Sequence, residues 1–345
     1  MRRSPIGVSG GKDSAVTALR TMEYLDALGH SGPRILIHSH LGRVEWQQSL
    51  PMCRQLADRV GLELVVVRRE SGDLLDRWRQ RWTSNVEQYA ALSSVRLMMP
   101  WSSAGLRFCT SELKIAPICR ELVRRFPGRR ILSVSGIRRD EIPGRAQAEV
   151  SRIQPRLGSS RQRTSGLDWH PILAWTLRDV LCYLDRRRFP LHEAYTRYLV
   201  SRVSCAYCVL SSQRDRSAAA QCASNQSVYR ELVALEVLST FSFRADRWLG
   251  DIAPALLDGD LRERFELTKL RAKQRQAAEA RIPAHLLYQA GWPQCSPSWS
   301  EARLLSEVRL EVAAAADIDV GFTQPETVMA RYEELFRARS QSRRG

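Results

Sequence analysis

The chain has 345 residues, 44% of them hydrophobic and 26% charged, which is typical of one large or two ordinary folded domains. No segment approaches the ~18 apolar residues of a membrane-spanning helix, and no apolar signal region follows Met1, so we expect a cytoplasmic protein without a membrane partner. The formal net charge is +16, which favours a polyanionic partner such as a nucleotide, DNA or RNA.

The positive charge lies almost entirely in the first part of the chain. Residues 1–215 contain 35 basic and 20 acidic residues, whereas residues 216–345 contain 18 and 17. Only four of the basic residues are lysines, and a biased base composition can produce such an excess of arginine. A compositional bias does not explain the difference between the two parts, so DNA or RNA stays a candidate partner.

A glycine-rich turn between a predicted strand at residues 4–9 and a predicted helix at residues 13–29 is the strongest functional signal. The turn consists of Ser9, Gly10, Gly11, Lys12, Asp13 and Ser14. Its glycines let backbone N–H groups approach a ligand, and the helix N-terminus and Lys12 add positive charge. The spacing matches neither a Walker A loop nor a dinucleotide-binding turn. We predict that the turn holds phosphate oxygens; a plain surface turn with a helix cap is the alternative.

Predicted strands and helices alternate along the rest of residues 1–215. We expect further strands at residues 34–38, 62–68, 131–135 and 169–173. We expect helices at residues 47–60, 73–89, 117–126 and 177–188. This alternation predicts an α/β fold, a doubly wound parallel sheet with helices on both faces. Thr176 is placed to cap the last of these helices.

Two segments depart from this pattern. Residues 151–168 are polar, basic and rich in Ser and Gly, which predicts either a mobile loop near the phosphates or a disordered insertion. After residue 215, helical spacing recurs at residues 228–238, 261–280, 302–316 and 327–339. We therefore expect a nucleotide-binding α/β domain at residues 1–215 and a helical C-terminal region at residues 216–345.

Polar side chains follow two of the predicted strands, at the edge where open parallel sheets bind ligands. His40 and Glu45 follow the strand at residues 34–38 and can contact adenine, ribose or a metal. The strand at residues 131–135 is followed by Gly136, Arg138, Arg139 and Arg145. Guanidinium groups match phosphate or sulfate oxygens with paired hydrogen bonds, so we expect the arginines to contact an anionic substrate. A capped loop and a solvated charged turn are the alternatives.

The eight cysteines are too sparse for a disulfide-rich secreted scaffold, and in a cytosolic chain they indicate metal binding or catalysis. Cys205 and Cys208 form a Cys-x-x-C motif, in which two thiolates can bind one metal centre or form a redox disulfide. Cys109 lies between basic residues that favour its thiolate, and Cys222 follows the motif. These four supply the thiolates of an iron–sulfur cluster or a tetrahedral zinc site. Small buried side chains are the alternative.

Taken in order, these segments resemble the phosphoadenosine phosphosulfate (PAPS) reductase superfamily over about residues 4–215. The glycine-rich turn resembles the pyrophosphate loop, or PP-loop, of the adenine-nucleotide α-hydrolases. The other matching segments are residues 41–46, 107–117, 136–145 and 170–180, followed by the Cys-x-x-C motif. The resemblance implies an adenine-nucleotide α-hydrolase-like fold and a substrate that is ATP or a sulfonucleotide (PAPS or APS), with Mg²⁺.

The resemblance also implies roles for single residues. Residues 9–14, His40 and Gly136 would bind the nucleotide, and Lys12 with the loop amides would hold pyrophosphate. The residues with implied catalytic roles are Lys12, Asp13, Arg138, Arg139 and Arg145. The arginines among them would stabilise the charge that develops in the reaction. The cysteines would hold a 4Fe-4S cluster, with zinc as the alternative.

The chain departs from the reductases of this superfamily in two places. Assimilatory reductases carry a C-terminal cysteine motif close to Glu-Cys-Gly-Leu-His, whereas the last cysteine here is Cys295, followed by Ser296 and Pro297. Cluster-bearing reductases have adjacent paired cysteines where this chain has Phe108 and Cys109. The chain is closer in character to the DNA-phosphorothioation PP-loop proteins.

Those proteins adenylate a target before sulfur transfer. That likeness implies cleavage of ATP to AMP and pyrophosphate, a nucleic-acid target, and a sulfur carrier such as a cysteine desulfurase. Two alternatives stay open. One is a sulfonucleotide reductase, and the other is a noncatalytic nucleotide- or nucleic-acid-binding module with structural zinc.

Overall fold

The computed structural model describes residues 3–141, 143–245 and 247–342. The chain forms two compact units. Unit 1 comprises residues 1–74 and 102–228, and unit 2 comprises residues 75–101 and 229–345. The sequence-based boundary after residue 215 did not anticipate this grouping of residues 75–101 with the later part of the chain.

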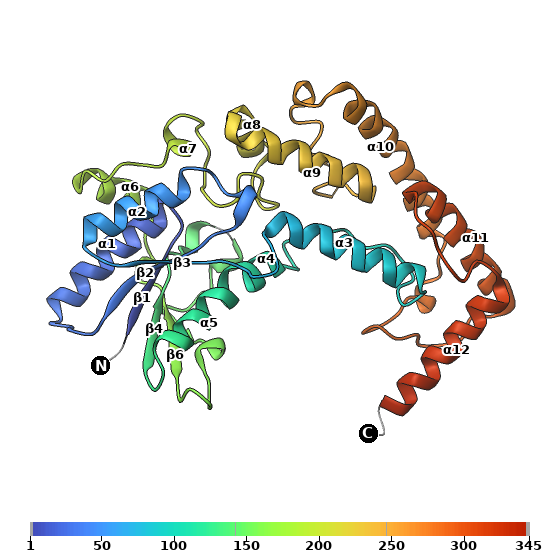
Figure 1. The fold of residues 1–345 in the computed structure, drawn as a ribbon, viewed down its shortest axis with the longest axis horizontal. Coiled ribbons are helices and arrows are strands. Elements are labelled where there is room, and N and C mark those ends of the chain that lie inside the picture. The colour runs from blue at the N-terminus through green and yellow to red at the C-terminus, as the bar shows by residue number, and fades with distance from the viewer. Residues whose placement is uncertain (1–2, 142, 246, 343–345) are drawn as a thin grey trace. The chain divides into compact units, whose positions relative to one another are not determined.

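Unit 1 is built on a six-stranded sheet with the strand order β3-β2-β1-β4-β6-β5 (Figure 1). The strands are β1 (Ser4–Val8), β2 (Arg34–Ser39), β3 (Leu64–Val67), β4 (Arg130–Val134), β5 (Ser151–Ile153) and β6 (Ser165–Trp169). Neighbouring strands are parallel except β5 and β6, which are antiparallel. The expected α/β fold is confirmed. The strand order reverses between β1 and β4, and open sheets of this kind bind ligands beyond the carboxyl ends of the strands at such a point.

Helices cover both faces of this sheet (Figure 1). Their bounds are α1 (Lys12–Ala27), α2 (Ser49–Val60), α5 (Ala116–Arg125) and α6 (Leu177–Arg186). Successive side chains of a strand point to opposite faces, so Leu36 of β2 is buried with α1, α2 and α6. Its neighbours Ile35 and Ile37 are buried with α5 on the other face. Thr176 caps α6, as expected, through a reciprocal pair of hydrogen bonds with Asp179.

Residues 151–168 are not the mobile or disordered loop that the sequence indicated. They form β5, a turn and β6, which extends the sheet beside β4. The final strand was expected at residues 169–173, but only Trp169 of that range belongs to β6. The polar composition has a physical reason, because β5 is an edge strand whose three residues are all exposed.

Short helices complete unit 1, and longer ones form unit 2. The remaining helices of unit 1 are α4 (Phe108–Thr110), the π-helical turn Ser111–Ile115, α7 (Glu193–Thr196) and α8 (Gln213–Gln221). Most of unit 2 consists of α3 (Leu74–Ala90), α9 (Gln226–Ser239), α10 (Gly259–Ala280), α11 (Trp299–Ala316) and α12 (Pro325–Ser342). Trp78 and Trp101 pack edge-to-face with each other and with Phe243, which joins residues 75–101 to the later helices. Among the described residues, no helix combines the length and the apolar character needed to cross a membrane.

Candidate functional site

The glycine-rich turn joins the carboxyl end of β1 to the start of α1. The Ser14 hydroxyl accepts a hydrogen bond from the Ser9 N–H at 3.2 Å and donates one to the Gly11 carbonyl at 2.8 Å. Gly10 has a φ of 74°, and a Cβ there would lie 2.7 Å from the carbonyl oxygen of Ser49. Only glycine fits at this point, and the turn is fixed with its N–H groups at a helix N-terminus. This geometry suits phosphate oxygens.

Lys12 is buried and connects the turn to a distant segment of unit 1. Its Nζ donates a hydrogen bond to the Ser201 carbonyl at 3.0 Å and lies 4.5 Å from the centre of the Tyr195 ring. The Tyr195 hydroxyl accepts the N–H groups of Lys12 and Val203 at 3.4 and 3.2 Å. Burial lowers the pKa of Lys12, and the carboxylate of Asp13 opposes that shift. Lys12 therefore fixes the turn against the segment that precedes the Cys-x-x-C motif.

The three predicted arginines have different surroundings. Arg138 is buried and pairs with Asp13 at 2.5 Å and with Asp140. Burial alone would lower the pKa of Arg138, but the two carboxylates outweigh it and raise that pKa. Arg139 is exposed and lines neither of the two cavities described below. Arg145 lines both of them, so it is the one of the three that is placed to meet a ligand.

A cavity of about 170 Å³, which we call the PP-loop cavity, opens beside the turn. On the side of the turn and β4 it is lined by Ser9, Gly11, Asp13, Ser14 and Gly136. On the other side it is lined by Lys114, Glu141, Arg145, Tyr195, Arg202, Val203 and Ser204. Three cationic side chains and a helix N-terminus face one small space, which favours an anionic ligand.

A second cavity of about 160 Å³, which we call the cysteine cavity, adjoins the first. Its lining includes Arg107, Cys109, Cys205 and Cys208. The two cavities share the residues Lys114, Arg145, Arg202 and Ser204, which we call the shared wall. Within it Lys114 Nζ donates a hydrogen bond to Ser204 Oγ at 3.1 Å. The Glu141 carboxylate pairs with Arg145 and lies 3.6 Å from Arg202, so it balances part of the charge.

The Cys-x-x-C cysteines contact each other in the cysteine cavity. A hydrogen bond from Cys205 lowers the pKa of the Cys208 thiol to about 5, and the cations Arg202 and Lys114 act in the same direction. The same hydrogen bond, with burial, raises the pKa of Cys205. Cys208 is therefore the thiolate of the pair, and it lies beside the shared wall.

The predicted four-cysteine metal site is not assembled in this structure. Cys109, Cys205 and Cys208 line one cavity, whereas Cys222 is absent from its lining, and its Sγ lies 3.2 Å from the Ser224 hydroxyl. Among the described residues, no group of three or more His, Cys, Asp or Glu side chains could hold a metal ion. The residues do not fit a four-thiolate iron–sulfur or zinc centre as they lie, and the mechanism proposed below uses none.

His40 is also separate from the PP-loop cavity. It lines a shallow hollow with Glu45 and Trp46, and its Nδ1 accepts the N–H of Gly42 at 3.2 Å. Its Nε2 lies 3.8 Å from the Glu45 carboxylate, which also pairs with the buried His38. The predicted contact between His40 and a nucleotide stays a prediction.

Sequence reasoning gave Lys114 a role only beside the Cys109 thiolate, and it gave Arg202 none. Arg202 lies three positions before Cys205, and that proximity was the available signal. Tyr195 and Ser201 carried no local signal, because only the folded chain brings them to Lys12.

A comparison with models of known protein families finds a match over the residues that build this site. Residues 5–210 match the model of the phosphoadenosine phosphosulfate reductase domain family. The chain belongs to this family. The match covers the PP-loop, the shared wall and the Cys-x-x-C motif of this PAPS reductase-family domain. A search of curated proteins gives no match.

Three solved structures are similar to parts of this chain at low sequence identity. A PAPS reductase from Candida auris in a phosphate complex is 14% identical, with a TM-score of 0.37, and the match covers 59% of this chain and 82% of that one. An FMN adenylyltransferase from Candida glabrata, bound to FMN and the ATP analogue AMPCPP, is 15% identical with a TM-score of 0.37, covering 59% and 55%. A U34-tRNA thiolase from Methanococcus maripaludis with its 4Fe-4S cluster is 13% identical with a TM-score of 0.34, covering 74% and 82%. At these scores the likenesses carry no argument about the reaction.

Proposed function

We propose that this PAPS reductase-family domain is a PP-loop enzyme that binds ATP and releases pyrophosphate while it activates DNA or RNA for sulfur transfer. The observation that carries the proposal is the pair of adjoining cavities, one at the PP-loop and one lined by cysteines, with cations in the wall between them. A nucleotide in the first cavity and a sulfur group in the second would be neighbours across Lys114, Arg145 and Arg202.

In the proposed reaction an oxygen of the acceptor attacks the α-phosphorus of ATP, and the bond from that phosphorus to the bridging oxygen breaks. Pyrophosphate leaves with the electron pair of that bond. The N–H groups of the PP-loop hold the phosphate oxygens, and Arg145 and Lys114 stabilise the charge that develops. Mg²⁺ is expected to accompany the nucleotide.

A sulfur carrier acts in the second half of the proposed reaction. The terminal sulfur of a persulfide on a cysteine desulfurase displaces AMP from the acceptor, which leaves a mixed disulfide between acceptor and carrier. A thiolate then attacks the carrier's sulfur and releases the acceptor with its new sulfur atom. Cys208 is the best candidate for that thiolate, because its pKa is lowered and it lines the cysteine cavity.

Pyrophosphate release tests this function. The wild-type protein is assayed with ATP, Mg²⁺, a nucleic-acid acceptor, and a cysteine desulfurase with cysteine. Lys12→Ala removes the contact between the PP-loop and Ser201, and Arg145→Ala removes a cation of the shared wall, so each should slow release about 100-fold. Arg262→Ala, at an exposed position of α10, is the control and should leave the rate unchanged. A Lys12→Ala protein as active as wild type would refute the catalytic role of the PP-loop.

Sulfonucleotide reduction is the second candidate, and the contact between Cys205 and Cys208 favours it because two neighbouring thiols can form a disulfide. Sulfite release from PAPS or APS with a thiol reductant, and no pyrophosphate release from ATP, would select this candidate. Binding of ATP without either product would select the noncatalytic module. Iron, sulfide and zinc analysis of anaerobically purified protein tests the cofactor prediction separately.

A further inference from the structure

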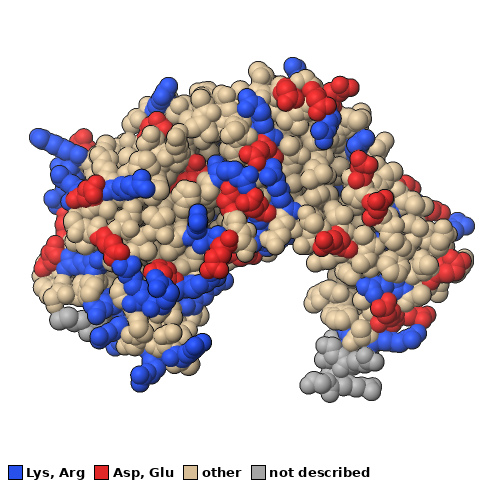
Figure 2. All heavy atoms as spheres, viewed as in Figure 1, with Lys and Arg blue, Asp and Glu red and all other residues tan. Residues whose placement is uncertain are grey.

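The surface of unit 1 carries an arginine-rich region that extends away from both cavities. Residues 122–139 and 150–167 together contain ten arginines and no Asp or Glu. Strands β4 and β6 lie side by side within these stretches, with Arg130 opposite Ser165 at their amino ends. Figure 2 shows Lys and Arg side chains gathered over α5 and over the lower ends of β4 and β6.

Two turns at the amino ends of β4 and β6 carry exposed arginines that have no ion-pair partner among the described residues. The Gly128 N–H donates a hydrogen bond to the Gln162 carbonyl at 2.7 Å, so the turns lie next to each other. The exposed arginines on or next to them are Arg129, Arg130, Arg161 and Arg163. Within the part of the chain that the structure describes, none of these four side chains forms an ion pair or a hydrogen bond.

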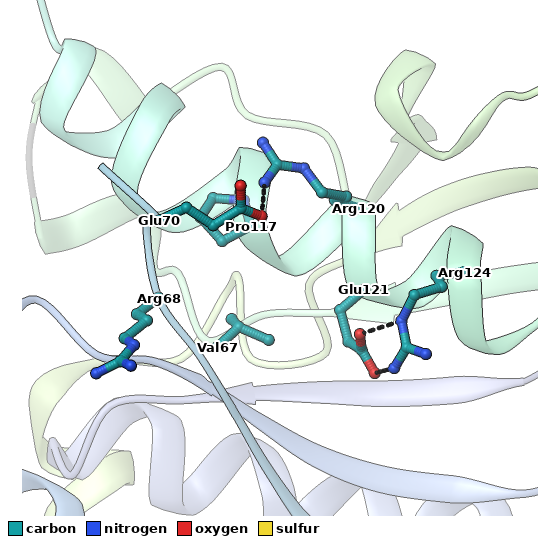
Figure 3. A pocket seen from close by; sticks show the side chains of 7 residues that line it. All are labelled: Val67, Arg68, Glu70, Pro117, Arg120, Glu121 and Arg124. Atoms are coloured by element: carbon teal, nitrogen blue, oxygen red, sulfur yellow. Dashed lines mark hydrogen bonds and ion pairs between the residues drawn. The ribbon is translucent and has the colours of Figure 1, made fainter. Parts of the chain in front are cut away.

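Arg120 and Arg124 of α5 are exposed as well, but they have carboxylate partners (Figure 3). Arg120 donates to Glu70 at 2.8 Å, and Arg124 pairs with Glu121 through two hydrogen bonds of 2.8 Å. A shallow groove of about 230 Å³ runs between this helix and the residues that end and follow β3, where Arg68 lies exposed on the opposite side. Arg120 and Arg124 are themselves largely exposed, so they can exchange these partners for a phosphate at little cost.

Helix α5 leads from the shared wall to the two turns. It begins at Ala116, two residues after Lys114, and ends at Arg125, shortly before Arg129. Its ten residues span about 15 Å at the rise of an α-helix. A DNA duplex carries one phosphate charge per ~1.7 Å of its axis, so a strip of this length faces several phosphates.

We propose that Arg120, Arg124, Arg129, Arg130, Arg161 and Arg163, which we call the arginine strip, form a docking surface for a nucleic-acid backbone. This inference rests on the proposed function. The strip would hold the nucleic-acid acceptor while one end of that acceptor reaches the two cavities. Guanidinium groups fit phosphate oxygens with paired hydrogen bonds, and they need no particular base sequence.

The residues next to the arginines indicate that the partner is a nucleic-acid backbone and not a lipid surface. The two turns contain Pro127, Gly128, Gly158, Ser159, Ser160 and Gln162. Among the described residues, the exposed large apolar side chains of this region, Val150 and Ile153, lie next to or on β5, and neither turn carries one to enter a bilayer, as an interfacial anchor requires. Serine hydroxyls and glycine N–H groups are instead common donors to phosphate.

A matched pair of double variants tests the strip. Arg161→Glu with Arg163→Glu reverses two charges in the strip, whereas Arg262→Glu with Lys273→Glu makes the same change in net charge on exposed positions of α10. Binding of fluorescent 25-base-pair DNA, single-stranded DNA and RNA is measured by anisotropy between 50 and 200 mM KCl, without ATP. The strip variant should bind at least about tenfold more weakly, with a salt slope lower by about 2. The α10 variant should stay within about threefold of wild type.

Equal weakening in both variants, or none in the strip variant, would overturn the proposal. Preferential binding to anionic vesicles, unaffected by competing DNA, would also overturn it. Arg161→Gln with Arg163→Gln guards against misfolding and should show about half of the effect with an unchanged unfolding midpoint. The strip variant should bind ATP as tightly as wild type does, because the strip lies outside the PP-loop cavity. Measuring ATP binding therefore tests the two proposals separately. If the wild-type protein bound DNA through the strip but released no pyrophosphate, the proposed function would be refuted and the arginine strip would not.

Discussion

At the scale of single residues, Gly136 decides how closely the end of β4 approaches α1. A Cβ at this position would lie 2.5 Å from the Thr17 hydroxyl and 2.7 Å from the carbonyl oxygen of Asp13. The carbonyl belongs to the first turn of α1 and cannot move freely. Gly136→Ala should therefore lower the free energy of unfolding by about 2 kcal/mol and weaken ATP binding. Denaturant unfolding and calorimetric titration with ATP measure the two effects.

Gly105→Ala is the matched control for that substitution, since a Cβ at Gly105 would meet nothing within 4 Å. It should leave both stability and ATP binding close to wild type. If Gly136→Ala behaved like Gly105→Ala, the close approach of β4 to α1 would be wrong.

The PP-loop residues could be predicted from the sequence because six consecutive positions contain the whole signal. Which cysteines come together could not be predicted in the same way. Cys205 and Cys208 are near in sequence and meet in the structure, but Cys222 is directed elsewhere by the fold after α8. The positions of Tyr195 and Ser201 beside Lys12 depend on more than 180 residues of intervening chain.

At the scale of elements, α11 is held to two other segments of unit 2 by one buried guanidinium. Arg309 donates hydrogen bonds to the carbonyl oxygens of Tyr89 at 2.9 Å and Gly321 at 2.7 Å. Arg309→Met would remove these hydrogen bonds from a buried position, and we expect a loss of about 2–4 kcal/mol in the free energy of unfolding. Arg303→Met, at an exposed position of the same helix, should cost under about 0.5 kcal/mol. Urea unfolding of both proteins makes the comparison, and equal costs would contradict it.

Helix α7 is capped by a histidine that must be neutral. His192 is buried, and its Nδ1 accepts the N–H of Ala194 at 3.0 Å. Burial lowers the pKa of His192 to about 4, against the opposing effect of Glu45, whereas in the unfolded chain it is about 6.5. The unfolded chain therefore binds this proton first, so stability is full above pH 6.5 and falls as the pH drops towards 4.

The expected loss between pH 7.5 and 4.5 is on the order of 2 kcal/mol from this group. Denaturant unfolding at several pH values measures it. His192→Asn keeps an acceptor at the cap but has no proton to bind, so its stability should fall less steeply over the same range. A variant with the wild-type slope would show that another group is responsible.

Most elements of unit 1 could be predicted because apolar strands alternate with amphipathic helices. The two strands that were not predicted with these bounds, β5 and β6, lie at the sheet edge beyond β4. There the strands need few apolar residues, so their composition resembles that of a loop. The arginines of this region are a second reason, because exposed charge is typical of both loops and edge strands.

At the scale of the whole molecule, the fold class followed from the sequence, but the grouping of residues into units did not. Helix α3 has the period of an ordinary crossover helix, and nothing local shows that its partners lie after residue 228. The contacts of Phe243 with Trp78 of α3, and with Trp101 after that helix, join parts of the chain more than 140 residues apart. Such contacts become visible only when the chain is folded.

The composition of unit 2 from two separate stretches of chain has a consequence during synthesis on the ribosome. Residues 75–101 emerge early, and Trp78 and Trp101 cannot pack against Phe243 until the chain beyond residue 228 has been translated. At about 5–20 residues per second this interval lasts many seconds, during which apolar surface stays open to chaperones and to other nascent chains. A gene fragment that ends after Val228 would make that exposure permanent. A single cut in the chain therefore cannot separate all of unit 1 from all of unit 2.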